Sequence, residues 1–243
     1  MKTLVLSDIH YKFAPRDRND RQNSETILRF LTAALAEEYD LLVLNGDIFD
    51  LWFDWRYSII KQYFPLLKRL ADFSERGCRI IYISGNHDFW FNDFFSTYLN
   101  AEIYQRCYIL EADGKKTLIT HGDLYTNNDA RYRIFRRLIR LPLMKRIFAL
   151  LHPDWALTIG AHISRSSRVR TLNDPVRQQK ISGLQQYAQK QLKHFDHIIM
   201  GHSHEPCLIT FPEGVYANSG DWIGHYSYVK LIDGNLELGK FEP

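Results

Sequence analysis

Short motifs of Asp, Asn and His residues stand out in this chain because each one directly follows an apolar run. They are Asp8-Ile9-His10, Asn45-Gly46-Asp47, Gly85-Asn86-His87-Asp88, His121-Gly122-Asp123 and Gly201-His202-Ser203-His204. Carboxylate, amide and imidazole groups without cysteine suit Mn²⁺, Fe²⁺ or Zn²⁺. The candidate metal ligands are Asp8, His10, Asp47, Asn86, His121, His202 and His204.

These candidate ligands exceed the needs of one ion, and with one bridging carboxylate they would fill two sites. A pair of ions ~3.5 to 4 Å apart is the arrangement that serves in-line displacement at phosphorus. Each motif alone is weak evidence for a metal site, because Asp-x-His is common by chance and His-x-His lies as often on the surface as at a metal. Together the motifs predict a dinuclear centre for hydrolysis at phosphorus.

The apolar runs before the motifs must be the elements that position them. These runs cover residues 4–7, 41–44, 79–84, 117–120 and 198–200. They are short and rich in apolar and β-branched residues, as in strands that are buried on both faces. Open α/β sheets place their ligand crevice at the carboxyl ends of the strands. We therefore expect the motifs to meet at one site.

The segments between these strands predict helices first and hairpins later. Residues 11–23 read as a loop, followed by a helix capped by Asn23 or Ser24, and a second helix over about 58–76 is interrupted at Pro65. Turn residues at 113–114, 212–214 and 233–235 predict hairpins, the last two closing the edge of a second sheet. The aromatic residues in 48–57 either pack beneath a helix or form an apolar wall beside the site.

Residues 124–191 lack any strand pattern. Apolar residues recur there at helical spacing, with breaks at Pro142 and Pro153. The basic residues of this region are Arg131, Arg133, Arg136, Arg137, Arg140, Lys145, Arg146, Arg165, Arg168 and Arg170. We interpret the region as a helical cap over the site. Its charge is either a solvated face or a surface for phosphate or anionic lipid.

The composition is that of an ordinary globular protein. The chain has 243 residues and a net charge of +3, too weak by itself to indicate nucleic acid. The unpaired cysteines Cys78, Cys107 and Cys207 suggest a reducing compartment. A first strand that leads directly to Asp8 does not fit a signal peptide, and no run reaches the ~20 apolar residues of a membrane span. We expect one cytosolic domain over residues 1–243, with membrane-surface contact left open.

In type, order and spacing, the motifs resemble those of the calcineurin-like metallophosphoesterase superfamily. This resemblance implies a four-layer α/β/β/α sandwich that holds two divalent ions, expected to be Mn²⁺, with Fe²⁺ or Zn²⁺ as alternatives. The implied ligands of one ion are Asp8, His10, Asp47 and His204. The implied ligands of the other are Asp47, Asn86, His121 and His202, so that Asp47 is the bridge.

The same resemblance implies roles for the residues beside the ligands. His87 would protonate the leaving oxygen or stabilise charge on the phosphoryl group, and Asp88 would orient the His87 imidazole. The alternative is that both are structural turn residues. Asn45 and Asp50 flank the bridging carboxylate and are expected behind the ligands. The remaining histidines are expected to be structural or on the surface: His152, His162, His194, His197 and His225.

A narrower resemblance is to the UDP-2,3-diacylglucosamine diphosphatase family of lipid A biosynthesis. It rests on residues 46–52, on the insertion after His121-Gly122-Asp123 and on Asp129-Ala130-Arg131-Tyr132. It implies a lipid-linked UDP-sugar as substrate, split into UMP and 2,3-diacylglucosamine 1-phosphate, and possible contact with the inner membrane surface. The implied substrate-binding residues are Asp129, Tyr132, Arg165, Ser167 and Arg168.

Two other classes of function remain open. A related phosphoesterase could act on another lipid phosphate, a nucleotide or a nucleic-acid diester. Nucleic acid is not expected as a partner, because the chain shows no separate binding module or aromatic stacking platform. The non-enzymatic alternative is an interaction scaffold on the same fold, for which Asp47 would be dispensable.

Overall fold

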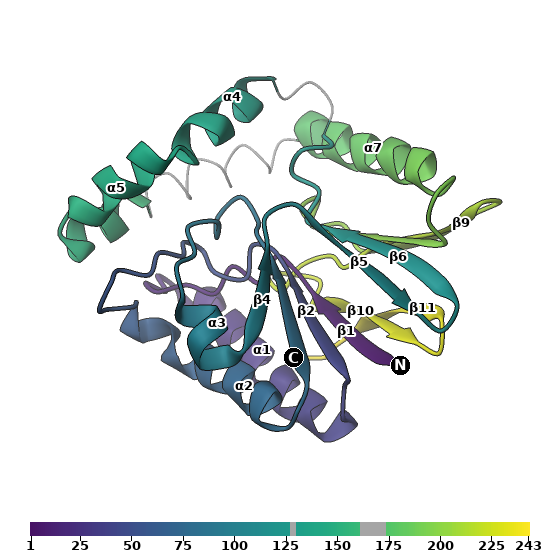
Figure 1. Ribbon diagram of the computed structural model, residues 1–243, viewed down its shortest axis with the longest axis horizontal. Helices are drawn as coiled ribbons and strands as arrows, with labels where there is room; N and C mark the ends of the chain where they lie inside the picture. Colours follow the sequence, from purple (N-terminus) through teal and green to yellow (C-terminus); the bar gives the residue numbers. More distant parts are fainter. Residues whose placement is uncertain (127–129, 161–173) are drawn as a thin grey trace.

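The computed structural model of the chain describes residues 1–126, 130–160 and 174–243 (Figure 1). A first sheet has the strand order β11-β10-β1-β2-β3-β4, with β1 to β4 parallel and β10 and β11 antiparallel. Its strands are β1 (Lys2–Leu6), β2 (Leu41–Asn45), β3 (Arg79–Ile83), β4 (Ala101–Tyr104), β10 (Ser227–Ile232) and β11 (Asn235–Lys240). The parallel strands β1 and β2 are almost entirely buried, as their apolar sequences predict.

A second sheet has the order β5-β6-β7-β9-β8, with parallel central strands and antiparallel edges. Its strands are β5 (Cys107–Ala112), β6 (Lys115–Thr120), β7 (His197–Met200), β8 (Cys207–Phe211) and β9 (Gly214–Asn218). Because β6 and β7 are parallel neighbours, the motifs that follow them emerge at the same edge of this sheet.

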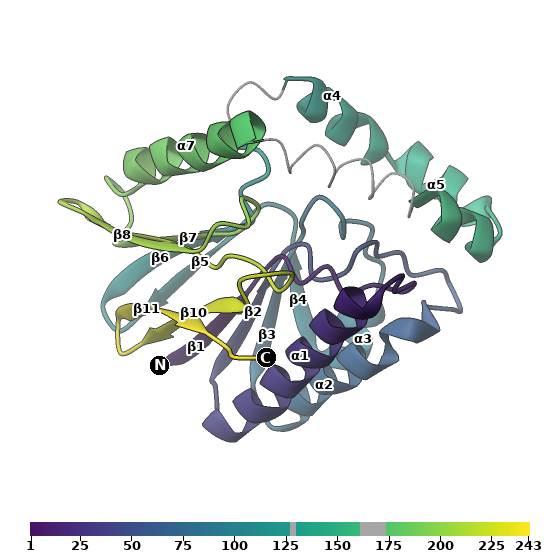
Figure 2. The ribbon, with the colours of Figure 1, turned by 180° about the vertical axis from the view of Figure 1, so that it is seen from behind.

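Helices cover the outer face of each sheet (Figures 1 and 2). The first sheet carries α1 (Arg18–Ala34), the 3₁₀ turns η1 (Leu35–Glu37) and η2 (Lys61–Tyr63), α2 (Phe64–Glu75) and α3 (Phe94–Leu99). The second sheet carries α7 (Asp174–Gln191), which buries Leu184 and Ala188 completely. The other helices, α4 (Ala130–Ile139) and α5 (Pro142–Leu150), lie beyond the loops at one end of the sandwich.

Three apolar cores lie between adjacent layers and hold them together. One packs α1 to α3 against the first sheet through residues such as Phe30 and Leu70. Another lies between the two sheets and contains Val43 and Ile199, and the third joins the second sheet to α7. The predicted four-layer α/β/β/α sandwich is therefore confirmed.

The local predictions were wrong at four places. The cap predicted over residues 124–191 extends too far, because α7 packs on the second sheet as the outer layer of the sandwich. Helix α1 begins at Arg18, not near Ser24, because the Asp17 side chain accepts a hydrogen bond from the backbone N–H of Asp20 at 2.8 Å and caps it. Pro65 does not interrupt a helix but lies in the first turn of α2, where a missing N–H is harmless. Both C-terminal hairpins were expected at the edge of the second sheet. The β8–β9 hairpin lies there, but the β10–β11 hairpin extends the first sheet beside β1.

Other local predictions are confirmed. The β5–β6 hairpin turns at Asp113 and Gly114, and α5 begins at Pro142. The three cysteines are free. Within the described ranges, the helices are too short or too polar to cross a bilayer.

Candidate metal centre

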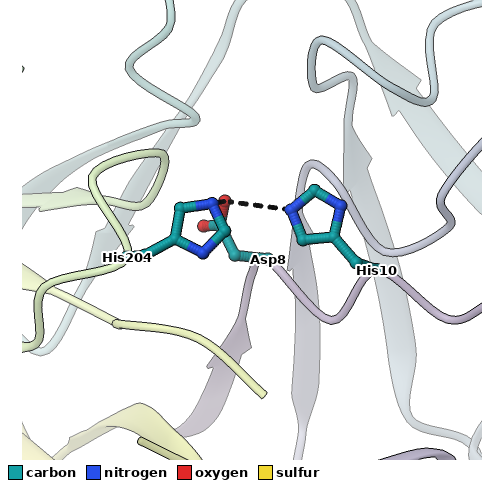
Figure 3. Close-up of side chains that lie close together, drawn as sticks. All are labelled: Asp8, His10 and His204. Atoms are coloured by element: carbon teal, nitrogen blue, oxygen red, sulfur yellow. Dashed lines mark ion pairs between the residues drawn. The ribbon is translucent and has the colours of Figure 1, made fainter. Parts of the chain in front are cut away.

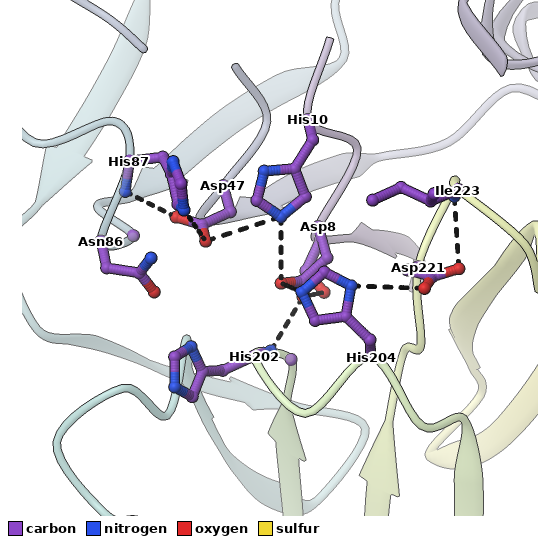
Figure 4. A network of polar contacts seen from close by, with 12 residues as sticks. Asp8, His10, Asp47, Asn86, His87, His202, His204, Asp221 and Ile223 are labelled. Carbon is purple, nitrogen blue, oxygen red and sulfur yellow. Dashed lines mark hydrogen bonds and ion pairs between the residues drawn. The ribbon is translucent and has the colours of Figure 1, made fainter. Parts of the chain in front are cut away.

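The motifs that follow β1, β2, β3, β6 and β7 converge at one end of the sandwich (Figure 4). A first metal group consists of Asp8, His10 and His204 (Figure 3). The Asp8 Oδ1 atom lies 3.4 Å from His204 Nε2 and 3.9 Å from His10 Nε2. These separations suit three donors that face a common cation.

A second metal group consists of Asp47, Asn86, His121 and His202. His121 Nε2 lies 3.1 Å from Asn86 Oδ1 and 3.5 Å from Asp47 Oδ2. The same Asp47 Oδ2 atom lies 3.8 Å from His10 Nε2, which belongs to the first metal group. One carboxylate oxygen therefore faces both groups, as a bridging ligand must.

Unpartnered polar atoms test whether these residues fit metal ions. The buried side-chain atoms without a hydrogen-bond partner in the described part of the chain include Asp8 Oδ1, His10 Nε2 and His202 Nε2. Leaving such a group unsatisfied costs about 1 to 3 kcal/mol each. All three atoms belong to the two metal groups, so cations bound there would satisfy them. The residues fit a pair of divalent ions.

The backbone at the ligands is strained. Asp8, His10, Asp47, His202 and His204 all have φ between 47° and 67°, in the left-handed region that side chains other than glycine rarely adopt. Such conformations cost about 1 to 3 kcal/mol each and concentrate at functional sites. The left-handed conformation turns the chain sharply at each of these residues, and the turn directs the side chain toward the centre.

Two glycines allow neighbouring loops to approach the ligands closely. A Cβ atom at Gly85 would collide with Asp47 Oδ1, and one at Gly201 would lie 2.5 Å from Asp8 Oδ2. Any larger residue at either position would therefore displace a carboxylate that faces the metal groups.

The ligand imidazoles are oriented through their other ring nitrogen. His121 Nδ1 lies 2.9 Å from the carbonyl O of Asn45, and His204 Nδ1 lies 3.2 Å from Asp221 Oδ2. Such contacts fix the tautomer and the orientation of a metal-binding imidazole. Sequence reasoning missed Asp221, whose only signal was a Gly-Asp pair soon after the strand now seen as β9. His225 Nδ1 also contacts Asp221, at 3.3 Å.

His87 lies beside the metal groups. Its Nδ1 atom is 3.0 Å from the carbonyl O of Asp50 and its Nε2 atom is 3.9 Å from Asp47 Oδ2. The His87 ring stands at 88° to that of His10, with 4.8 Å between centroids. The side chain thus faces the same space as the Asp47 carboxylate.

The role predicted for Asp88 was wrong, since this side chain does not orient His87. Its oxygens accept hydrogen bonds from the backbone N–H groups of Asp47, Ile48, Phe49 and Gly85 and from the Tyr82 hydroxyl. The orienting contact of His87 is instead the Asp50 carbonyl. Asp88 is fully buried, and it holds the turn that carries Asp47.

Charge is distributed unevenly among the imidazoles. Burial lowers the pKa of His10 and lowers that of His202 further, so both are neutral at pH 7. Burial also disfavours protonated His121, but the carboxylates of Asp47 and Asp8 outweigh it and raise the pKa of His121 to about 10. Because a metal binds neutral imidazole, a cation in the second metal group would release that proton.

The expected substrate-binding residues are only partly visible. Asp129, Arg165, Ser167 and Arg168 lie outside the described residues. The Tyr132 hydroxyl donates a hydrogen bond to Asp123 Oδ2 at 2.7 Å, which brings the start of α4 close to the loop of His121.

The aromatic segment after β2 packs beneath helices, which is one of the two arrangements predicted for it. Phe49 and Trp52 are buried in the core beneath α2 and α3. Phe53 and Trp55 instead contact Phe148 of α5, with ring centroids 4.9 and 6.3 Å apart. The segment is thus a floor on which the cap helix rests.

Comparisons with known proteins show a family and several similar proteins. The family model of calcineurin-like phosphoesterases matches residues 1–206. A UDP-2,3-diacylglucosamine hydrolase of Porphyromonas gingivalis is 30% identical over 168 residues, which cover 69% of this chain and 63% of that protein. A protein of the same name from Pectobacterium carotovorum is 27% identical and covers 99% of both chains. Among solved structures, a phosphoesterase from E. coli is 17% identical, covering 97% of this chain and 91% of that chain at a TM-score of 0.47.

Proposed function

Because the chain belongs to the calcineurin-like phosphoesterase family, we propose that it hydrolyses the diphosphate of UDP-2,3-diacylglucosamine, using two divalent ions. The products are UMP and 2,3-diacylglucosamine 1-phosphate. Metal-dependent hydrolysis of a phosphate ester or anhydride follows from the family and from the metal groups. The choice of this substrate is supported by the names of relatives that align with up to 99% of the chain.

The observation that carries the proposal is the position of Asp47 Oδ2. This atom lies within 4 Å of imidazole nitrogens from His10, His87 and His121. Ions held on either side of it would polarise a phosphoryl oxygen and lower the pKa of water. Oxygen and imidazole donors without thiolate suit Mn²⁺, which we propose as the ion, before Fe²⁺ and Zn²⁺.

His87 is the proposed proton donor to the leaving oxygen. Its Nδ1–H donates to the Asp50 carbonyl, so in the imidazolium form Nε2 carries a second proton, faces the site and can pass this proton to the leaving oxygen. An imidazole held by a fixed backbone acceptor keeps one orientation through the reaction. The Asp50 carbonyl thus has the positioning role first assigned to Asp88.

The cap helices suit the lipid part of the substrate. Exposed apolar side chains on and beside α4 and α5 are Ile134, Phe135, Leu138, Leu141, Leu143, Ile147 and Leu150. Burial of each CH₂ group of an acyl chain contributes about 0.8 kcal/mol, so a few of these contacts would decide chain-length preference. Asp129, Tyr132, Arg165, Ser167 and Arg168 remain the proposed contacts to the sugar and phosphates.

The same surface is the proposed contact with the membrane that supplies the substrate. Arg133, Arg137 and Arg146 are exposed among its apolar residues. An apolar and basic helical surface favours the interface of an anionic bilayer. We therefore place the protein in the cytoplasm, at the inner face of the membrane.

The proposal is tested by comparing substrates on the purified protein with Mn²⁺. The expected result is release of UMP from UDP-2,3-diacylglucosamine in detergent micelles, at a kcat/KM far above that for bis(p-nitrophenyl) phosphate or single-stranded DNA. Asp47→Ala should abolish it. Faster cleavage of the diester or the DNA would contradict the lipid substrate, and full activity of Asp47→Ala would contradict the metal mechanism.

A further inference from the structure

Helix α4 contacts two of the loops that carry metal ligands. Arg136 Nε donates to Asp123 Oδ2 at 2.5 Å, beside the Tyr132 hydroxyl at 2.7 Å. Arg140, which directly follows α4, donates from Nη2 to the carbonyl O of Gly85 at 2.6 Å and from Nη1 to Ser84 Oγ at 3.4 Å. One helix is thereby tied to the loops after β6 and β3.

These contacts are sheltered from water. Asp123 is only 4% exposed, and the Arg136 side chain is 14% exposed. The Arg140 guanidinium lies 4.8 Å from the centroid of the Phe89 ring. Surface ion pairs contribute little, but removing one partner of a buried pair leaves an uncompensated charge and is strongly destabilising. The Arg136–Asp123 pair is therefore strong enough to hold a loop in place, and the charged Arg140 guanidinium makes a charge-assisted hydrogen bond to the Gly85 carbonyl.

Both loops supply ligands to the second metal group. Asp123 is two residues after His121, and Gly85 directly precedes Asn86. His121 Nε2 and Asn86 Oδ1 are 3.1 Å apart, so small shifts of either loop would separate two donors of this group.

The first metal group is supported from within the sandwich. Ser7 Oγ donates to Asp8 Oδ2 at 2.6 Å and also contacts Ser219 Oγ at 2.6 Å. Asp221 holds His204. None of these supports belongs to α4 or α5. The two metal groups thus differ in whether a cap helix braces them.

We propose that Arg136 and Arg140 are positioning residues for the second metal group, so that the docking of α4 sets the affinity for one ion of the pair and leaves the other unchanged. This inference rests on the proposed dinuclear site. Binding of the second ion would then depend on the position of α4. Movement of α4 would lower the affinity of the second metal group for its ion and leave that of the first metal group unchanged.

The test is a titration of the metal-free full chain with Mn²⁺, followed by calorimetry and by the electron paramagnetic resonance signal of a coupled Mn²⁺ pair. Wild type should bind two ions and give the coupled signal. Arg140→Met, which keeps the stem over Phe89, should weaken one binding step about 10- to 100-fold, the usual cost of losing an outer support of a metal ligand. Arg136→Met should do the same, and Arg140→Lys should restore part of the loss.

Arg137→Met is the matched control, because Arg137 lies on the same helix but is exposed, and it should titrate like wild type. Thermal unfolding of each metal-free variant verifies the fold. Two unchanged binding steps in both Arg140→Met and Arg136→Met would overturn the positioning role alone, as would equal weakening of both steps. A wild-type chain that binds one ion would overturn the dinuclear site as well.

Discussion

A single carboxylate oxygen, Asp47 Oδ2, faces imidazoles of both metal groups. The convergence of the candidate ligands could be predicted from sequence, because the motifs follow parallel strands whose carboxyl ends meet at one edge of a sheet. The residues that hold these side chains in place could not be predicted from sequence. Asp88 and Asp221 are acids in Gly-containing turns, and whether such an acid faces an imidazole or a backbone N–H depends on the fold of several loops. That is why Asp88 was misassigned and Asp221 was missed.

His87→Gln tests the proton donor. Glutamine can occupy the same place but cannot transfer a proton, so kcat should fall about 10²- to 10⁴-fold, with KM and Mn²⁺ stoichiometry unchanged. Steady-state kinetics across pH, with calorimetric metal titration as the control, measures this. Loss of a bound ion in the variant would show that His87 is a ligand, and an unchanged kcat would show that another group supplies the proton.

Asp221→Asn tests the support of His204. Burial alone would raise the pKa of Asp221, but the hydrogen bond and charge of His204 outweigh it and lower that pKa. A carboxyl group with a lowered pKa stabilises the folded state above its unfolded pKa of about 4 and loses this contribution as the pH falls. The metal-free variant should therefore be less stable than wild type at pH 7 and differ less from it at pH 3.

Urea unfolding of the metal-free proteins at both pH values measures this difference, and calorimetry should show weaker Mn²⁺ binding at one site. For the metal titration, Asp196→Asn is a suitable control, because Asp196 is another acid with a lowered pKa and accepts from the backbone N–H of Lys116, not from a candidate ligand. Equal stability of Asp221→Asn and wild type at pH 7 would contradict the account.

The cap helices are joined to the sandwich by a few side chains. Phe148 of α5 contacts Phe53, Trp55 and Trp90, and Lys145 donates to the carbonyl O of Phe91 at 2.6 Å. Helical spacing and Pro142 predicted these helices from sequence. The surface against which these helices pack could not be predicted, because the aromatic residues after β2 could pack under either α2 or the cap.

Phe148→Ala should loosen the cap without unfolding the sandwich. Truncating a well-buried Phe costs about 3 to 5 kcal/mol, and the half-buried Phe148 should lose less. We expect faster proteolysis within residues 130–160 and a raised KM for the lipid substrate, with kcat on a small chromogenic ester nearly unchanged. Limited proteolysis followed by mass spectrometry measures the first effect.

For the proteolysis, Leu150→Ala is the control, because Leu150 lies on the same helix and is 88% exposed. Unchanged cleavage of the Phe148 variant, or cleavage first within α1 to α3, would show that the contact does not anchor the cap.

The two sheets bring together motifs that are far apart in the chain, with Asp8 and His202 separated by 194 residues yet joined by a 2.8 Å hydrogen bond. The layered architecture could be predicted because buried parallel strands require helices on their outer faces. The sheet to which the β10–β11 hairpin belongs could not be predicted, because strand pairing between remote segments depends on the whole arrangement. Its pairing with β1 braces the strand that carries Asp8.

The central claim is that two cations share Asp47, and anomalous diffraction from crystals grown with Mn²⁺ tests it most directly. The account predicts two anomalous peaks about 3.5 to 4 Å apart, one beside Asp8, His10 and His204 and the other beside Asn86, His121 and His202, with Asp47 Oδ2 between them. A single peak, or peaks that do not contact Asp47, would contradict it.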